Sequence, residues 1–252
     1  MAGNENSVVK YLLSKRGKLF LNHLGVISSV ANPGRSGDPI EIKTFDEVVS
    51  CDSHKKADIY LNYKGVSIKQ RGSSFAYNRI QRANILAIMS ELGVRDAQVV
   101  LKKLDDLIVR FHEGNLNSRD RPWCEAFSEE DFRLMLRYLM MEGSVEHGVS
   151  ENKAEYILSA PAVISSDRDI ECLTFDEYFE KYKNIFYISL RRVWRGQDSN
   201  SEHRRAVGLC SKVGNSPWCF KSISGEPRSG WMSSYPSSNR MTAYILFITL
   251  KP

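Results

Sequence analysis

Residues 56–70 read KADIYLNYKGVSIKQ, and the predicted fold is built around them. Residues 57–63 alternate apolar and polar side chains and are rich in Ile, Tyr and Leu, which predicts a strand. The pair Lys64-Gly65 is a tight-turn signal, and residues 66–70 are expected to return as a second strand. The stretch therefore predicts a β-hairpin.

Three polar side chains are expected to meet at one end of this hairpin. Asp58 lies on the first strand, and Lys69 follows Ser67 by two residues on the second. Residues i and i+2 of a strand share a face, so these groups can converge. A carboxylate beside a backbone carbonyl suits Mg²⁺, and a nearby ammonium can orient or deprotonate an attacking water. The trio favours metal-assisted phosphodiester hydrolysis, although an ordinary surface hairpin fits the same spacing.

A dense set of hydrogen-bond donors surrounds the hairpin. A helix is predicted over residues 80–92, and its N-terminus would aim Asn78 and Arg79 at the active end of the hairpin, where a phosphate is favoured. The candidate DNA-binding residues of this region are Lys56, Gln70, Arg71, Ser73, Ser74, Asn78, Arg79 and Arg82.

The hairpin resembles the catalytic hairpin of the PD-(D/E)XK nuclease superfamily, in which acidic residues bind metal and Lys acts at the nucleophile. Within that superfamily it is most similar to small type II restriction endonucleases that cut four-base GC-only palindromes. Those enzymes carry a Lys-x-Asp strand, a neutral residue in place of the second acid, an x-Lys, and a polar loop that enters a helix. The positions that match this pattern are Lys56, Asp58, Ser67 and Lys69. The helical middle and the last strand match in character only.

The resemblance implies an α/β (α+β) fold with a mixed central β-sheet flanked by helices around a PD-(D/E)XK nuclease-like core. It implies a sequence-specific endonuclease that hydrolyses double-stranded DNA with Mg²⁺ and leaves 5′-phosphates. In that reading Asp58 holds the metal, Lys69 assists the water, and Ser67 and the Ile68 carbonyl complete the site. It also implies a restriction-modification system in a prokaryote, with a cognate DNA methyltransferase.

Two positions depart from the family pattern. Ala57 stands where Pro is usual, and Ser67, an uncharged and weak metal ligand, stands where the second acid is usual. The number of metal ions is therefore open. The missing carboxylate can come from nearby acids, or the Ile68 carbonyl can act alone with waters; the candidate acids are Asp46, Glu47 and Asp52.

The charge is concentrated in the last third of the chain. The formal net charge is +5, and residues 191–240 hold seven Arg and two Lys against three acids. This excess favours a polyanionic partner, against the alternative of a solvated surface. The polar loop over residues 229–240 is a second candidate reader of base edges, unless it is a flexible hairpin turn. The candidate DNA contacts here are Arg191, Arg195, Ser234, Asn239 and Arg240.

The 252 residues are expected to form a single restriction-endonuclease-like domain. The catalytic hairpin and helices would occupy residues 1–150, and a strand-rich DNA-binding part would occupy residues 151–252. Helices are predicted over residues 7–24, 80–92, 96–111 and 128–143 and after Thr44 and Thr174, and strands over 154–158, 185–193, 206–212 and 241–250.

Five cysteines without a paired CxxC fit a reducing compartment. The chain begins without a signal-peptide pattern, and no apolar run reaches the ~18 residues that span a bilayer. We expect a cytoplasmic protein without membrane contact, either a monomer or a homodimer. Two alternatives stay open: a structure-specific DNA repair or recombination nuclease, and a non-catalytic DNA-binding protein in which Ser67 marks an inactive site.

Overall fold

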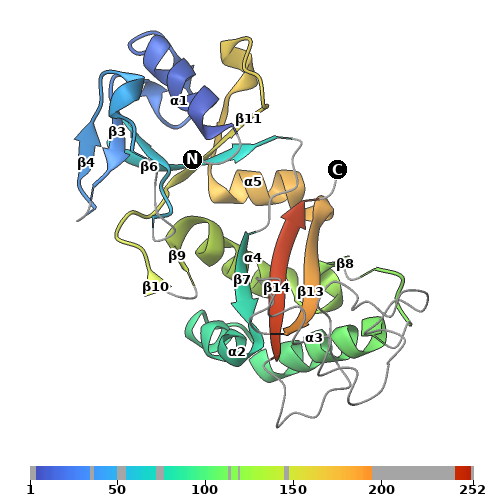
Figure 1. Ribbon diagram of the computed structural model, residues 1–252. Coiled ribbons are helices and arrows are strands. Elements are labelled where there is room, and N and C mark those ends of the chain that lie inside the picture. Colours follow the sequence, from blue (N-terminus) through green and yellow to red (C-terminus); the bar gives the residue numbers. More distant parts are fainter. Residues whose placement is uncertain are drawn as a thin grey trace. The chain divides into compact units, whose positions relative to one another are not determined.

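The computed structural model describes most of the chain (Figure 1). The described residues are 4–34, 37–49, 55–71, 77–112, 115–118, 120–144, 148–194 and 242–250. The chain divides into two compact units, the first made of residues 1–77, 133–186 and 250–252 and the second of residues 78–132 and 187–249. Each unit contains residues from both of the expected parts of the chain, residues 1–150 and residues 151–252. The single nuclease-like domain stays a prediction.

The first unit is built on a mixed sheet. Its six described strands lie in the order β12-β11-β6-β5-β3-β4. β6 and β11 are parallel, and the other neighbouring pairs are antiparallel. The expected α+β fold with a mixed central sheet is therefore confirmed. The strands are β3 (Val30–Pro33), β4 (Pro39–Glu41), β5 (Ile59–Leu61), β6 (Lys64–Gln70), β11 (Tyr156–Ala160) and β12 (Glu171–Leu173).

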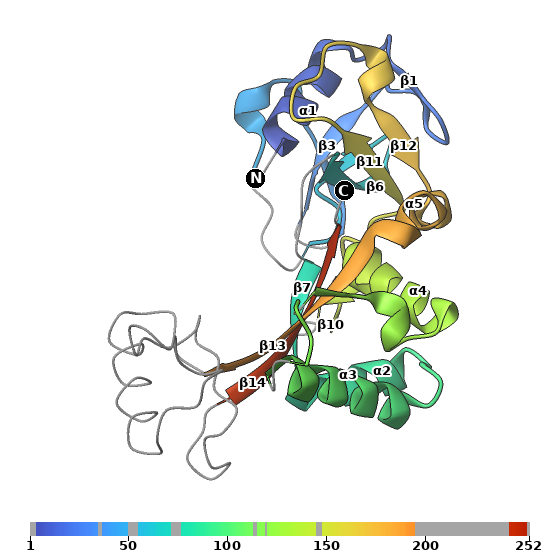
Figure 2. The ribbon, with the colours of Figure 1, turned by 90° about the vertical axis from the view of Figure 1, so that its right-hand side faces the viewer.

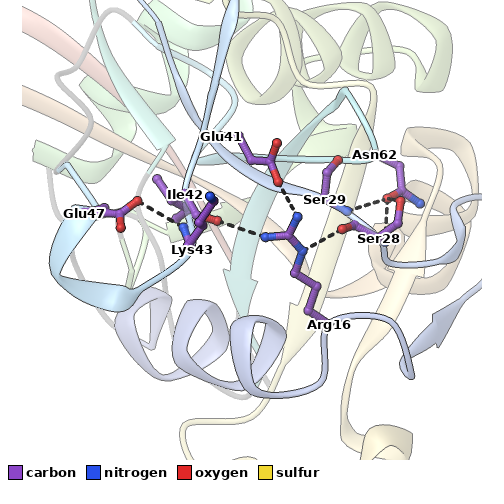
Figure 3. Close-up of polar contacts among 8 residues, drawn as sticks. All are labelled: Arg16, Ser28, Ser29, Glu41, Ile42, Lys43, Glu47 and Asn62. Carbon is purple, nitrogen blue, oxygen red and sulfur yellow. Dashed lines mark hydrogen bonds and ion pairs between the residues drawn. The ribbon is translucent and has the colours of Figure 1, made fainter.

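The predicted hairpin is formed by β5 and β6, with Ile59 paired to Val66. The prediction that Lys64-Gly65 forms its turn is wrong, because the turn residues are Asn62 and Tyr63, with φ of 49° and 65°. The Asn62 side chain holds this left-handed turn, since its Oδ1 accepts from the Ser28 N–H at 2.9 Å and its Nδ2 donates to the Val26 carbonyl at 2.8 Å. Figure 3 shows the Ser28 contacts.

The core of the first unit lies between this sheet and α1 (Glu5–Ser14), which runs along one face of it (Figure 2). Leu12 of α1 is fully buried in one cluster with Ile68 of β6 and Leu158 of β11. Because Ile68 faces this core, its neighbours Ser67 and Lys69 point to the opposite face of the sheet. The hairpin thus packs one face against the core and carries the polar side chains on the other.

The helix predicted to reach Leu24 ends at Ser14. The chain then forms a short antiparallel pair, β1 (Phe20–Leu21) and β2 (Gly25–Val26). Gly17 and Gly25 have φ of 77° and 72°, a conformation that a helix does not contain. The Arg16 guanidinium fixes the chain after α1 by donating to the Ser28 carbonyl at 2.6 Å and pairing with Glu41 (Figure 3).

Shorter elements complete the first unit. The helix predicted after Thr44 is a single 3₁₀ turn, η1 (Phe45–Glu47). The capping box of Thr174 and Glu177 is present as predicted and opens α5 (Phe175–Tyr182), which packs against β11 and β12. The others are the π-helical turn η3 (Tyr138–Glu142), β9 (Gly143–Ser144), β10 (Gly148–Val149), η4 (Asp167–Asp169) and η5 (Lys183–Ile185).

The second unit has its own sheet, whose four described strands lie in the order β7-β14-β13-β8. The sequence predicted a central strand over residues 241–250, and β14 does lie between two neighbours. Helices α2 and α3 lie on one side of this sheet (Figure 2). The elements are β7 (Tyr77–Gln81), α2 (Arg82–Glu91), α3 (Ala97–His112), β8 (Asp120–Pro122), η2 (Trp123–Glu125), β13 (Phe186–Trp194) and β14 (Thr242–Leu250). α4 (Glu129–Arg137) begins in this unit.

Two sequence predictions change here. The helix expected from residue 80 begins at Arg82, since the preceding residues form β7, so Asn78 and Arg79 lie on a strand and not at a helix N-terminus. The helix expected over residues 128–143 is α4 followed by η3. The strand predicted over residues 206–212 lies outside the described residues. None of the helices in the described ranges has both the length and the apolar character to cross a membrane.

Candidate functional site

The polar face of the hairpin brings together the side chains that the sequence singled out. Asp58 Oδ2 accepts hydrogen bonds from the Ile68 N–H at 2.6 Å and the Ser67 hydroxyl at 3.3 Å. Lys69 Nζ lies 4.0 Å from the same oxygen and donates to the Ile68 carbonyl oxygen at 3.2 Å. The expectation that Asp58, Ser67 and Lys69 meet is confirmed, and their chemical roles stay predictions.

Backbone pairing positions these groups. The Asp58 N–H donates to the Val66 carbonyl at 2.9 Å, which continues the β5–β6 ladder and places Asp58 across from Ser67. On its other side β6 is fixed by β11, in parallel register with Lys69 beside Ser159. The carboxylate and the ammonium therefore come from an interior part of the sheet, where backbone hydrogen bonds on both sides restrict their movement.

The trio is only partly exposed to solvent. The Ser67 residue is 1% exposed, and the Asp58 and Lys69 side chains are 17% and 19% exposed. Partial burial strengthens the attraction between the two charges, because less water screens it than at an open surface. The remaining exposed fraction leaves the two charged groups within reach of a ligand.

A second ammonium lies close to the trio. Lys56 Nζ donates to the Leu139 carbonyl of η3 at 2.9 Å. Burial lowers the pKa of Lys56 to about 8; the Lys69 charge acts in the same direction, and the Asp58 charge opposes it. Two neighbouring cations beside one carboxylate favour an anionic ligand such as a phosphate. Lys56, predicted to contact DNA, thus has its ammonium directed to the backbone of η3 in this structure.

The donor set suits a hard cation. Asp58, Ser67 and the Ile68 carbonyl offer oxygen atoms only, which is the ligand type that Mg²⁺ takes, together with several waters. Across the described residues, no group of three or more His, Cys, Asp or Glu side chains is gathered in a metal-binding arrangement. One carboxylate with two neutral oxygens fits a site that leaves Mg²⁺ much of its water shell.

The other acids that could bind the metal, Asp46, Glu47 and Asp52, precede the hairpin in the sequence. Glu47 accepts from the Lys43 N–H at 3.0 Å and from the Thr44 hydroxyl at 3.1 Å, and the Lys43 bond lowers the pKa of this exposed carboxyl. Asp46 is exposed on the same turn, and Asp52 lies outside the described residues. Glu47 is thus engaged in closing η1, and the second acidic ligand stays unassigned.

Arg71 is the predicted DNA contact whose surroundings are best defined. Its guanidinium donates to the Ser159 carbonyl at 3.3 Å and the Asp169 carbonyl at 3.2 Å, and it pairs with Glu171 at 3.4 Å. These contacts hold Arg71 against β11 and β12. A DNA contact by this residue would compete with them, and it stays a prediction.

The remaining DNA-binding predictions are placed only in part. Gln70 is the half-buried last residue of β6. Arg82 is the first residue of α2 and Arg191 lies in β13. The positions that lie outside the described residues are Ser73, Ser74, Arg195, Ser234, Asn239 and Arg240, with the loop over residues 229–240. Their role in binding DNA stays a prediction.

One residue beside the site, Asn152, carries no recognisable pattern in the sequence. Asn152 is 3% exposed, and its backbone carbonyl accepts from the Lys56 and Ala57 N–H groups at 3.0 Å and 2.9 Å. It stands in a polar run, SENK over residues 150–153, which is typical of a surface loop. Only the tertiary structure shows that this loop lies against the residues preceding Asp58.

Comparison with family models, curated proteins and solved structures finds no match for this chain. Function is therefore argued from the chemistry of the site itself. The grouping of a carboxylate, two lysines and a backbone carbonyl, from β6 and the segment that precedes β5, defines a candidate site for an anionic substrate and a hard cation.

Proposed function

We propose that this protein is a sequence-specific, Mg²⁺-dependent DNA endonuclease of the type II restriction class, with a core like that of the PD-(D/E)XK nucleases. One observation carries the proposal: the Asp58 carboxylate and the Lys69 ammonium, on adjacent segments of one hairpin, lie 4.0 Å apart. The Lys69 contact with the Ile68 carbonyl supports it, because the same carbonyl is a candidate metal ligand.

The residues have distinct parts in this reaction. The Ile68 N–H and the Ser67 hydroxyl hold the Asp58 carboxylate in one orientation, which avoids its reorganisation during the reaction. Asp58 and the Ile68 carbonyl would hold Mg²⁺. When bound, this ion supplies Lewis-acid polarisation of the phosphate and lowers the pKa of a bound water.

Lys69 acts at the attacking water and at the phosphate. Its ammonium donates hydrogen bonds and offsets the negative charge that develops on the phosphoryl oxygens. The water oxygen forms a bond to phosphorus while the bond to the 3′ oxygen breaks. The water gives up a proton and the 3′ oxygen gains one, leaving a 3′-hydroxyl on one fragment and a 5′-phosphate on the other.

Cleavage by three variants tests the assignment. Asp58→Asn and Lys69→Met remove the proposed groups, and Lys64→Met is the matched control. Lys64 lies on the same strand, but its exposed ion pair with Glu155 is of a kind that contributes little to stability. With Mg²⁺ and plasmid DNA, the two site variants should lose a factor of about 10² or more in rate, and the control should cleave as the wild type does.

The same assay separates the alternatives. Discrete fragments from linear phage DNA support a site-specific enzyme, and nicking only at junctions or flaps would indicate a structure-specific repair or recombination nuclease. Binding of DNA without cleavage in either Mg²⁺ or Mn²⁺ would indicate a non-catalytic DNA-binding protein. If Asp58→Asn or Lys69→Met cleaves at near the wild-type rate, the site assignment is wrong.

A further inference from the structure

We propose that Asn152 is a positioning residue that fixes the segment carrying Asp58. Its consequence for catalysis rests on the proposed function, whereas its effect on Asp58 does not. Asn152 follows β10 in sequence, far along the chain from the hairpin, and touches neither Asp58 nor Lys69 in the contacts named above. It acts through the backbone and through Tyr60.

Asn152 contacts the chain on both sides of Asp58. Its backbone carbonyl accepts from the N–H groups of Lys56 and Ala57, the two residues before Asp58, at 3.0 Å and 2.9 Å. Its Oδ1 accepts from the Tyr60 hydroxyl at 3.1 Å, two residues after Asp58. One buried residue thus accepts three hydrogen bonds from residues on both sides of Asp58 in the sequence, and we call this set of bonds the bracket.

The side-chain amide nitrogen joins this bracket to the rest of the sheet. Asn152 Nδ2 donates to the Gly34 carbonyl, which follows β3, at 3.0 Å. Both ends of the amide are therefore satisfied in the interior, where an unpaired polar atom costs free energy. The amide can meet both partners only in one orientation, so Asn152 fixes Tyr60 relative to β3.

The residues after Asn152 pack tightly on the second strand of the hairpin. The Glu155 N–H donates to the Gly65 carbonyl at 2.7 Å. A Cβ added at Gly65 would lie 2.2 Å from the Lys153 carbonyl oxygen, far closer than a Cβ atom approaches a non-bonded oxygen. On its other side this segment is fixed to η3, since the Ala154 N–H donates to the Met141 carbonyl at 2.8 Å. Residues 152–155 therefore clamp both strands.

The bracket matters because the Asp58 carboxylate is held by a short contact. Its Oδ2 lies 2.6 Å from the Ile68 nitrogen, so a small displacement of residues 56–60 weakens that hydrogen bond. Removing the Asn152 amide would leave the Tyr60 hydroxyl and the Gly34 carbonyl without this partner. The backbone carbonyl of residue 152 would keep its bonds to Lys56 and Ala57, so the anchor would be lost on the Tyr60 side of Asp58. The segment would then shift, and the carboxylate would move away from Ile68 and Lys69.

The test compares Asn152→Ala with Asn32→Ala in the full-length protein. Asn32 is a matched control because it is also buried, with 6% exposed, and its amide likewise joins two backbone groups, the Glu47 carbonyl at 2.8 Å and the Val49 N–H at 3.2 Å. Neither partner flanks Asp58. Both substitutions should lower the thermal midpoint by a similar amount.

The first readout is the Ile68 amide proton in an NMR spectrum, which needs neither DNA nor metal. A short hydrogen bond to a carboxylate moves this proton downfield. Asn152→Ala should move it upfield, in the same direction as Asp58→Asn, and Asn32→Ala should leave it in place. Tyr60→Phe, which removes one of the bracketing bonds and keeps the buried aromatic ring, should cause a smaller shift of the same sign.

The second readout is the kinetics of DNA cleavage. Asn152→Ala should lower kcat by about 10- to 100-fold at nearly unchanged KM, since displacement of a reacting group by ~1 Å has effects of this size. A general loss of stability would also lower the apparent kcat at unchanged KM, because less of the protein would be folded. The comparison with Asn32→Ala excludes this cause, since that variant is expected to be destabilised to a similar degree and should retain both values.

The positioning role is overturned if Asn152→Ala and Asn32→Ala leave the Ile68 proton equally unmoved. If Asn152→Ala does not fold, Tyr60→Phe decides in its place: an unmoved Ile68 proton in that folded variant overturns the role, and an upfield shift supports it. Absence of cleavage by the wild-type protein would refute the proposed nuclease, while the NMR comparison would still decide the role of Asn152.

Discussion

Replacing Ser67 by Asp places a second carboxylate where the resembled nucleases commonly carry one. The Ser67 hydroxyl lies 3.3 Å from Asp58 Oδ2, and the residue is 1% exposed. The new charge would therefore lie against the existing one with little room to turn toward solvent. We expect Ser67→Asp to destabilise the metal-free protein at pH 7 and to make its stability depend strongly on Mg²⁺.

The size of the effect follows from the geometry. Two unit charges ~4 Å apart repel by about 4 kcal/mol at an effective dielectric constant of 20. Protonating one carboxyl instead costs a similar amount, because the ordinary pKa of an Asp carboxyl, near 4, lies ~3 units below pH 7. Each of these pKa units corresponds to about 1.4 kcal/mol. Lys69, 4.0 Å from Asp58, offsets part of the repulsion. The expected loss is about 2–4 kcal/mol in the free energy of unfolding.

Mg²⁺ should restore much of this loss, because two carboxylates bind a divalent cation more tightly than one. At a Mg²⁺ concentration ~100 times Kd, binding contributes about 2.7 kcal/mol. Urea unfolding in EDTA and in Mg²⁺ measures both quantities. Ser67→Asn is the control, because it adds similar volume without charge. If Ser67→Asp and Ser67→Asn respond equally to Mg²⁺, the hairpin does not hold the metal and the reasoning is wrong.

Two predictions concern stability. Gly65→Ala should cost about 1–3 kcal/mol or more by urea unfolding, since its Cβ would lie 2.2 Å from the Lys153 carbonyl oxygen; an unchanged midpoint would contradict this close approach. Burial raises the pKa of Cys172 to about 12 from 9.0. Above pH 9 the unfolded thiol loses its proton while the folded thiol keeps it, so stability should fall as pH rises, by about 2 kcal/mol at pH 10.5. Cys172→Ala should remove this contribution, and an identical pH slope in the variant would refute it.

The hairpin could be predicted because its information is local. The alternation of residues 57–63 and the spacing of Ser67 and Lys69 follow from the two-residue period of a strand. The two strands of the hairpin are also neighbours in the sequence. The turn could not be located from the dipeptide Lys64-Gly65. Asn62 takes the left-handed position because its amide meets backbone groups of residues 24–29, which belong to a distant segment.

The first helix was extended too far for a related reason. Leu19 and Leu21 continue the apolar spacing of α1, and both are buried in the core that the helix helps to form. They reach that core from a loop and a short strand, because Gly17 reverses the chain. Hydrophobic spacing shows which residues are buried, and it does not show whether a helix carries all of them.

The parts of the site that escaped prediction are the long-range ones. Leu139 offers its carbonyl to Lys56, and Asn152 brackets Asp58, although both lie more than eighty positions further along the chain. No local sequence pattern marks an asparagine whose backbone carbonyl accepts hydrogen bonds from two distant N–H groups, because the tertiary fold alone brings these groups together. The charged groups of a site can thus be predicted while the residues that fix them cannot.

End-mapping of cleaved DNA tests in one experiment whether the protein is a sequence-specific nuclease that depends on Asp58. Sequenced phage DNA is incubated with Mg²⁺ and either the wild-type protein or Asp58→Asn, and every new fragment end is sequenced and assayed for its phosphate. We predict that wild-type ends share one short sequence and carry 5′-phosphates, and that Asp58→Asn yields no new ends. Ends without a common sequence, 3′-phosphates, or the same ends from Asp58→Asn would contradict the account.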